Sequence, residues 1–371
     1  MERRQFLKLS AMGALGATAL AACGTGNEDL DQALQDESLP QLNWELATSW
    51  PTSQDTIFGG AQTFADRVTA MTGGKFTITA RAGGELTKPL EILQTVQSGG
   101  IQMGHTASYY YIGLDPITAF GTALPFGLTA RQQNSWLYRG GGLELLQAAY
   151  AEKFNAIQFP AGNTGVQMGG WFNREIKSKK DLEGLKMRIP GLGGQVMERL
   201  GVTVQVLPGG EIFQALQTGA IDATEWVGPY DDQKLDFQSV TKFYYYPGWW
   251  EPGPSLEVQI NLDEWKKLPE EYQEVIKAAA AQANVDMMAD YDAKNPPALQ
   301  NLINETDITL LPFPDDVMEA AEDEAFSLFD EFAAKDADFK SILDHWTKFR
   351  SGIRQWHNLA ERSYLQYESK F

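Results

Sequence analysis

Apolar and polar residues alternate in two short stretches, and each stretch is followed by a segment with helical spacing. Residues 76–80 (FTITA) and 202–206 (VTVQV) have the two-residue period of half-buried strands. After each one, apolar residues recur at helical intervals until a glycine, Gly99 or Gly219, ends the helix and a short strand follows. The pattern predicts one β-α-β unit in each half of the chain.

These two units are copies of one another. Residues 91–103 (EILQTVQSGGIQM) align with residues 211–223 (EIFQALQTGAIDA) at a constant offset of 120, with six of thirteen positions identical. Two such units, separated by the length of a domain, predict two α/β domains with mostly parallel sheets. Ligands bind beyond the carboxyl ends of strands in sheets of this kind. We therefore expect residues 105–111 and residues 225–230 to face a cleft.

The remaining pattern completes this plan. Further strands are expected at residues 44–50, 156–159, 186–191 and 255–261. Helices are expected at residues 55–71, at 130–154, at 269–303 with a break at Pro296 and Pro297, and along the tail from Asp315 to Phe371. The expected division is domain I at 42–157 plus about 254–268, domain II at 158–253, and a helical region at 269–371. That region would brace both domains or form a dimer contact.

Composition narrows the possible partners. The chain has 371 residues, of which 43% are apolar, enough for two hydrophobic cores. Its net charge is -19, from 49 acidic and 30 basic side chains, and this charge repels nucleic acid and anionic lipid. A carboxylate ligand would need a local positive site.

The N-terminus predicts export. Arg3 and Arg4 precede a short apolar run, as in a twin-arginine signal peptide over residues 1–22. Cys23, the only cysteine of the chain, follows Leu-Ala-Ala and begins a polar linker over residues 23–41, which is typical of a lipoprotein. Cleavage after Ala21 would instead release a freely soluble periplasmic protein.

Enzymatic motifs are missing from the sequence. Of the three histidines, His105 follows a predicted strand, whereas His345 and His357 are twelve residues apart in the tail, which is not a metal-ligand spacing. The sequence contains no G-x-S-x-G, P-loop, H-E-x-x-H or C-x-x-C motif. A binding protein is therefore favoured over an enzyme.

Two charged residues follow predicted strands. Arg188 interrupts an apolar strand, where it could form an internal salt bridge or hold a ligand carboxylate in two parallel hydrogen bonds. Glu225 could cap a helix or, together with Gln167 and Glu251, bind Na⁺ or Ca²⁺ through hard oxygen donors. Aromatic clusters near strand ends could form either pocket walls or core. These clusters are Tyr109–Tyr111, Trp171 with Phe172, Tyr244–Tyr246, and Trp249 with Trp250.

Two motifs carry a family resemblance. DLEGLKMRIPG (181–191) and EIFQALQTGAIDATEW (211–226) resemble the DctP-type solute-binding proteins of TRAP (tripartite ATP-independent periplasmic) transporters, and the likeness runs from about Trp44 to Asn304. The resemblance implies a two-domain periplasmic-binding-protein fold that closes on an organic acid. It also implies that Arg188 holds the ligand carboxylate and that TRAP membrane subunits receive the ligand.

The chain is most similar to the family members that bind 2-oxo acids or lactate with a metal ion. It shares with them HTASYYY (105–111), NTGVQMGGWF (163–172), EWVGPYDD (225–232) and GWWEPG (248–253). The resemblance implies cation ligands at Gln167, Glu225, the Trp226 carbonyl and Glu251. It implies ligand contacts at Arg188, Gln167, Trp226, Tyr110, Tyr111, Asn163 and Phe172. The tail after Asn304 resembles a dimer-forming extension of this subgroup.

Three hypotheses remain open from the sequence. The first is a periplasmic receptor that delivers a small 2-oxo or 2-hydroxy monocarboxylate, such as pyruvate or lactate, to TRAP membrane subunits. The second is a metal-dependent enzyme acting on 2-oxo acids, with His105 as its base. The third is a sensor that presents the ligand to a membrane signalling partner.

Overall fold

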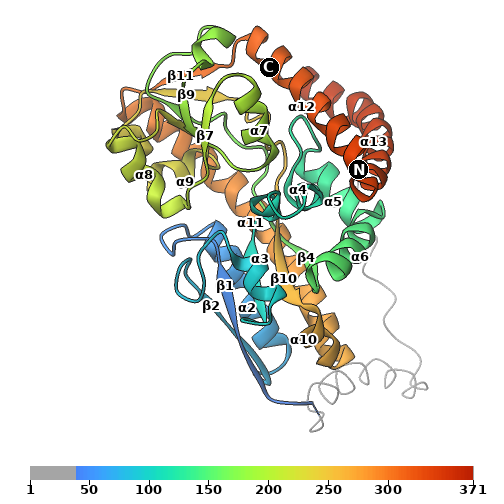
Figure 1. Ribbon diagram of the computed structural model, residues 1–371. Helices are drawn as coiled ribbons and strands as arrows, with labels where there is room; N and C mark the ends of the chain where they lie inside the picture. The colour runs from blue at the N-terminus through green and yellow to red at the C-terminus, as the bar shows by residue number, and fades with distance from the viewer. Residues whose placement is uncertain (1–38, 371) are drawn as a thin grey trace, which may run out of the picture. The chain divides into compact units, whose positions relative to one another are not determined.

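The computed structural model describes residues 39–370 and has two β-sheets with helices around them (Figure 1). The expected signal peptide, Cys23 and nearly all of the linker lie outside the described residues. Within residues 39–370, no helix is both long and apolar enough to span a membrane. We call the elements around the first sheet the first lobe and those around the second sheet the second lobe.

The first sheet has the strand order β2-β1-β3-β10-β4. Strands β2 and β3 run parallel to β1, whereas β10 is antiparallel to both β3 and β4. The strands are β1 (Leu42–Thr48), β2 (Phe76–Arg81), β3 (Met103–Thr106), β4 (Ala156–Asn163) and β10 (Ser255–Asn261). Because β4 reaches Asn163, this sheet extends past the domain boundary expected at residue 157.

The second sheet has the order β11-β9-β5-β8-β6-β7. Strands β7 and β8 run parallel to β6, and β5 is antiparallel to both β8 and β9. The strands are β5 (Trp171–Phe172), β6 (Lys186–Arg188), β7 (Thr203–Gln205), β8 (Ala223–Thr224), β9 (Phe243–Tyr246) and β11 (Thr309–Pro312). Both sheets are mixed rather than mostly parallel.

The internal repeat is confirmed as a structural repeat. Helix α3 (Ile92–Gln97) links β2 to β3, and α8 (Gly209–Gln217) links β7 to β8. Gly99 and Gly219 follow these helices with φ of +74° and +70°, values that glycine adopts most readily. In each sheet the two linked strands flank a third strand, β1 or β6, so the carboxyl ends of all three parallel strands point the same way.

The helices differ from the sequence expectation in two places. The single helix expected at 130–154 is two helices, because Gly141 has a left-handed φ of +86° between them. The break expected at Pro296 and Pro297 does not occur, and α11 runs through both prolines. Contacts with α2, β4 and α9 along α11 hold it helical despite the two missing N–H donors.

The helices have the following bounds. In the first half they are α2 (Ile57–Met71), α4 (Ala119–Thr122), α5 (Ala130–Arg139), α6 (Gly142–Phe154) and α7 (Gly191–Arg199). In the second half they are α9 (Pro229–Lys234), α10 (Leu262–Lys267), α11 (Glu270–Glu305), α12 (Asp315–Lys335), α13 (Ala337–His357) and α14 (Ser363–Glu368). A π-helical turn, Asn358–Arg362, lies between α13 and α14.

As a group, the three long helices contact both lobes. Helix α11 lies between the two groups of strands (Figure 1) and contacts β4 of the first lobe and α9 of the second. Helix α12 packs on α7, while α13 packs on α5, α6 and α12. The tail histidines belong to this packing: His345 accepts a hydrogen bond from Trp136 Nε1 (3.1 Å), and His357 contacts the Gln132 amide.

Candidate functional site

The carboxyl ends of strands from both sheets converge on one small cavity. Trp50, Tyr109 and Tyr110 reach it from β1 and β3, and Arg188 and Glu225 reach it from β6 and β8. The remaining lining residues are Ile57, Thr164, Gln167, Trp226, Val227, Glu251, Pro254 and Leu256. The two loops expected to face a cleft, after β3 and after β8, therefore do face the same cavity.

Gln167 and Glu251 lie on the two segments that cross between the sheets, after β4 and before β10. These segments are hydrogen-bonded to each other: Gln167 N–H donates to the Glu251 carbonyl (3.2 Å), and Gly248 N–H donates to the Gln167 carbonyl (2.9 Å). The Glu225 N–H in turn donates to the Arg188 carbonyl (3.3 Å). The backbone thus holds the side chains of four polar residues around the cavity.

Arg188 is 1% exposed and is held in place on three sides. Its Nε donates to the Leu207 carbonyl (3.0 Å), and its Nη1 forms an ion pair with Glu225 Oε1. The guanidinium lies 5.3 Å from the centre of the Trp226 ring, as in a cation–π contact. The internal salt bridge expected as one alternative is therefore present, and it leaves part of the guanidinium available.

Four buried polar atoms around the cavity have no hydrogen-bond partner within residues 39–370. They are Arg188 Nη2, Glu225 Oε2, Glu251 Oε2 and Gln167 Oε1. A buried polar atom without a partner costs about 1–3 kcal/mol, so four in one place indicate missing ligands. Three oxygens suit a hard cation such as Na⁺ or Ca²⁺, and one guanidinium nitrogen suits an acid. The residues around the cavity therefore fit both a hard cation and a carboxylate ligand.

The charges at the cavity do not balance. Burial raises the pKa of Glu225 to about 7, although Arg188 opposes the rise. Burial, and next the charge of Glu225, raise the pKa of Glu251 well above its usual range. Two carboxylates face one guanidinium, so a bound cation would relieve the repulsion between them. No group of three His, Cys, Asp or Glu side chains forms a metal site within residues 39–370, and the set expected here contains only two carboxylates.

The turn after β8 is fixed by a carboxylate that the sequence analysis did not single out. Asp232 Oδ1 accepts hydrogen bonds from the N–H groups of Val227 (3.1 Å) and Gly228 (3.0 Å). Its Oδ2 accepts hydrogen bonds from Trp171 Nε1 (2.9 Å) and the Tyr244 hydroxyl (2.8 Å). The available signal was an acidic pair in the first turn of a helix that begins with proline.

Three of the expected ligand contacts lie away from the cavity lining. Tyr111 is buried in the core, with its hydroxyl 2.9 Å from Thr106 Oγ1. Phe172 packs on Tyr245 in the second sheet. The Asn163 amide shapes the crossing segment: its Oδ1 accepts a hydrogen bond from Gly165 N–H (2.8 Å). Tyr109 lies within the loop expected to face the cleft, whereas the lining residues Trp50 and Thr164 were not expected, although each follows a strand end.

His105 has no free nitrogen for acid–base chemistry. Its Nδ1 accepts a hydrogen bond from Trp50 Nε1 (2.8 Å), and its Nε2 lies 3.1 Å from the Ala161 carbonyl. Burial lowers the pKa of His105 to about 4, which keeps the ring neutral. His105 therefore positions Trp50, and it does not line the cavity.

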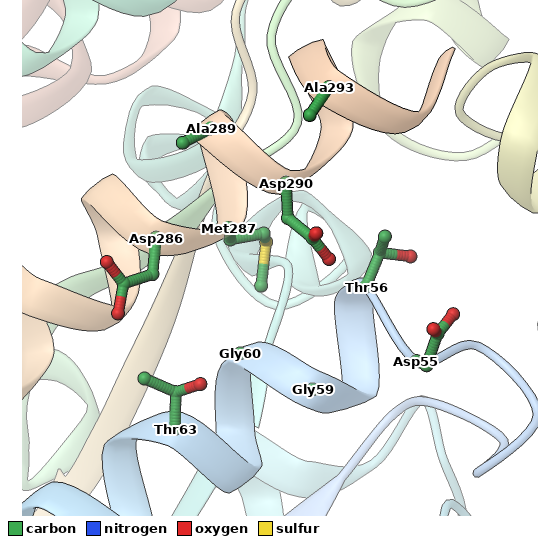
Figure 2. A pocket seen from close by; sticks show the side chains of 10 residues that line it. All are labelled: Asp55, Thr56, Gly59, Gly60, Thr63, Asp286, Met287, Ala289, Asp290 and Ala293. Atoms are coloured by element: carbon green, nitrogen blue, oxygen red, sulfur yellow. The ribbon is translucent and has the colours of Figure 1, made fainter. Parts of the chain in front are cut away.

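A larger groove of about 460 Å³ lies between α2 and α11 (Figure 2). Its polar wall consists largely of Asp55, Asp286 and Asp290, together with Thr56 and Thr63. No arginine, lysine or histidine lines this groove. A small carboxylate would be repelled there, so the enclosed cavity is the better candidate for an acid.

Comparisons with known proteins agree with this site. The chain is 53% identical over 369 residues, 100% of this chain and 99% of the relative, to the monocarboxylate 2-oxoacid-binding periplasmic protein of Nostoc sp.. A TRAP transporter solute-binding protein of Bordetella bronchiseptica, with calcium and picolinate in its active site, has a TM-score of 0.88 at 43% identity. That match covers 89% of this chain and 98% of the other.

Another similar structure is a TRAP periplasmic solute-binding protein of Pseudoalteromonas atlantica with bound sodium and pyruvate. Its TM-score is 0.85 at 38% identity, over 88% of this chain and 99% of the other. Residues 46–336 match the family described as bacterial extracellular solute-binding protein, family 7. This chain, with its two-lobed α/β fold, belongs to that DctP family of solute-binding proteins, which are transport receptors and not enzymes.

Proposed function

We propose that this receptor binds a small 2-oxo or 2-hydroxy monocarboxylate, such as pyruvate or lactate, together with Na⁺ or Ca²⁺. The observation that carries the proposal is the set of four unpartnered polar atoms around one enclosed cavity. Relatives of this chain are named for 2-oxo acids or hold pyruvate with sodium or calcium, which supports the same ligand class.

In the proposed complex, Arg188 Nη2 donates to the ligand carboxylate while Nη1 stays with Glu225. The cation takes oxygens from Gln167, Glu225 and Glu251, and from the backbone carbonyl of Trp226. The ligand reaches the same cation through its carboxylate and its C2 oxygen, which selects such acids over plain fatty acids. Tyr110, beside the guanidinium, completes the polar end of the cavity.

Closure of the two lobes would bury the acid and the cation together. The described structure is closed, because residues of both lobes enclose a cavity that leaves little free space. The closed form is what TRAP membrane subunits would recognise, since only ligand-dependent closure distinguishes a loaded receptor from an empty one. This step supports a role in delivery to the membrane subunits.

A ligand panel tests the proposal directly. Pyruvate, lactate and propionate are added to the purified protein in buffer with Na⁺ and Ca²⁺, and in sodium-free buffer with a chelator. Pyruvate or lactate at about a hundred times its Kd should stabilise the protein by about 2.7 kcal/mol. Propionate, which lacks the C2 oxygen, should stabilise it far less. Equal stabilisation by propionate, or binding that survives cation removal, would contradict the proposal.

We also propose export by the twin-arginine route and lipidation at Cys23, on the sequence grounds given above. The intact mass of the mature protein tests this. A protein that begins at a diacylated Cys23 and a protein that begins after Ala21 without lipid have different masses. Cys23→Ala removes the lipidation site, so the variant should be found in the soluble fraction, whereas the lipidated wild type stays in the membrane fraction. A homodimer through the C-terminal helices is proposed as well, supported by exposed apolar side chains on residues 356–367.

A further inference from the structure

A segment of the first lobe that lies outside the ligand cavity is bonded to the second lobe. Residues 54–56 precede α2, and they contact the turn after β8 and helix α9, more than 170 positions later in the chain. Gln54 is fully buried and uses both ends of its amide. Its Oε1 accepts from Trp226 Nε1 (2.8 Å), and its Nε2 donates to the Asp231 carbonyl (3.3 Å).

Thr56 occupies the N-cap position of α2, yet its hydroxyl does not cap the helix. A threonine at this position usually accepts a hydrogen bond from the first turn of its own helix. Here the hydroxyl donates to Asp231 Oδ1 in the other lobe instead. The second oxygen, Asp231 Oδ2, accepts from the Tyr291 hydroxyl on α11 (2.6 Å), so the carboxylate is already oriented for Thr56.

Asp55 adds a more exposed contact beside these two. It accepts from the Tyr230 hydroxyl (3.0 Å) and pairs with Lys234, both on α9. Its side chain is 49% exposed, so this ion pair contributes little in water. The buried bonds of Gln54 and Thr56 are therefore the stronger part of the contact.

The contact bears on ligand capture through Trp226. Trp226 follows Glu225 in the turn that carries the proposed cation ligands, and its ring lies beside Arg188. Gln54 is thus one hydrogen bond away from the site without lining the cavity. Opening of the lobes would separate residues 54–56 from this turn, so the contact exists only in the closed form.

We propose that Gln54 and Thr56 are positioning residues for closure: they bind the Trp226–Asp231 turn across the lobes and set the affinity for every ligand without touching any of them. The inference rests on the proposed function only for the choice of ligand. Loss of a contact made only in the closed form reduces the closed fraction and lowers the apparent affinity by that factor.

The test compares Thr56→Val, which removes the hydroxyl and keeps the shape, with Thr56→Ser, which keeps the hydroxyl. Thr63→Val is the matched control, because Thr63 lies further along the same helix, at the groove wall between α2 and α11 (Figure 2). Affinities for pyruvate and for its one-carbon-longer homologue are measured by calorimetry with the cation present, and dissociation rates by stopped-flow fluorescence.

Thr56→Val should weaken both ligands by the same factor, about tenfold, which corresponds to about 1.4 kcal/mol. The loss should appear as faster dissociation, with the melting temperature of the ligand-free protein unchanged. Thr56→Ser and Thr63→Val should stay within about threefold of the wild type, while Gln54→Leu should behave like Thr56→Val.

Three results would overturn the inference. The first is an unchanged ligand affinity in both Thr56→Val and Gln54→Leu. The second is a variant that changes which of the two ligands binds more tightly. The third is a variant that melts at a lower temperature without ligand but keeps the wild-type affinity. Failure of the wild type to bind any 2-oxo acid would instead refute the proposed function, and the variants would then be compared with the acid that the protein does bind.

Discussion

Arg188 combines two tasks that usually compete in a buried arginine. One nitrogen neutralises Glu225, and another remains free toward the cavity. A guanidinium can do both because its donors point in fixed, divergent directions in one plane. An ammonium group has neither this spread nor this rigidity, so the residue type itself is a testable part of the site.

We expect Arg188→Lys to lower the affinity for pyruvate by at least a hundredfold and to leave the ligand-free protein folded. Lysine keeps a positive charge beside Glu225 but has no second donor fixed toward the ligand carboxylate. Arg188→Met is the contrasting variant: with Glu225 unpaired, the free energy of unfolding should fall by about 3–5 kcal/mol. Calorimetry measures the ligand affinity of each variant, and thermal unfolding measures its stability. Equal ligand affinity in Arg188→Lys and wild type would contradict the assignment.

Glu257 is another buried carboxyl, on β10 and outside the cavity lining. Burial raises its pKa to about 7, against a hydrogen bond from Gln259 Nε2 (3.1 Å). Between pH 4.5 and 7 the folded protein therefore keeps a proton that the unfolded chain has released. Its contribution to stability is present below pH 4.5 and is lost as the pH rises through 7.

Glu257→Gln should remove this pH dependence. Relative to the wild type, the variant should gain up to about 3 kcal/mol at pH 8, from about 1.4 kcal/mol for each unit of pKa shift. Near pH 4.5, where the wild-type carboxyl is protonated when folded, the two proteins should differ little. Denaturant unfolding at both pH values measures the difference. A gain of the same size at both pH values would show that packing, and not ionisation, is responsible.

At the scale of elements, the break between α5 and α6 depends on one glycine. Gly141 has φ of +86°, and a side chain added there would meet the His345 ring of α13 at 3.4 Å. Gly141→Ala should lower the free energy of unfolding by about 1–2 kcal/mol, because alanine is strained in the left-handed region. Gly59→Ala is the control: Gly59 is helical with open space around it, so alanine should stabilise by about 0.5–1 kcal/mol. Urea unfolding compares them, and equal changes would contradict the conformational argument.

Sequence patterns predicted those elements whose signal is local. The β-α-β repeat has alternating strands and glycine stops, and both copies fold as expected. Strands β5, β9 and β11 were not predicted because they have two to four residues each and exist only through pairing with distant strands. The continuity of α11 through Pro296 and Pro297 likewise depends on packing against other elements.

The same limit applies to the candidate site. The position of Glu225 after its strand was enough to predict that it faces the cavity. The placement of Tyr111 and Phe172 was not predictable, because neighbouring side chains in a strand or a tight turn point in different directions. Tyr109 and Tyr110 line the cavity, whereas the next residue, Tyr111, points into the core. A shift of one residue along the chain therefore decides whether a side chain lines the cavity or points into the core.

At the scale of the whole molecule, the C-terminal helices are packed on the lobes for most of their length and carry exposed apolar side chains at their end. Helices α12 and α13 pack on the lobes along most of their length. At the end of α13 and beyond it, Trp356, Leu359 and Tyr364 are 61%, 71% and 64% exposed, and Leu365 and Tyr367 are similarly exposed. So many large apolar side chains in a short stretch are typical of an association surface. The similar structure from Bordetella bronchiseptica is that of a dimer.

We expect the purified wild-type protein to sediment as a dimer and the double variant Leu359→Asp, Leu365→Asp to sediment as a monomer at micromolar concentration. Two carboxylates in an apolar contact would each lose hydration without gaining a partner, so association becomes unfavourable. Val285→Asp is the matched control, because Val285 is 55% exposed on α11, away from the C-terminal segment, and should leave the dimer intact. Pyruvate affinity should persist in the monomer, because none of residues 356–367 lines the cavity. A wild-type protein that is monomeric at all concentrations would refute the dimer.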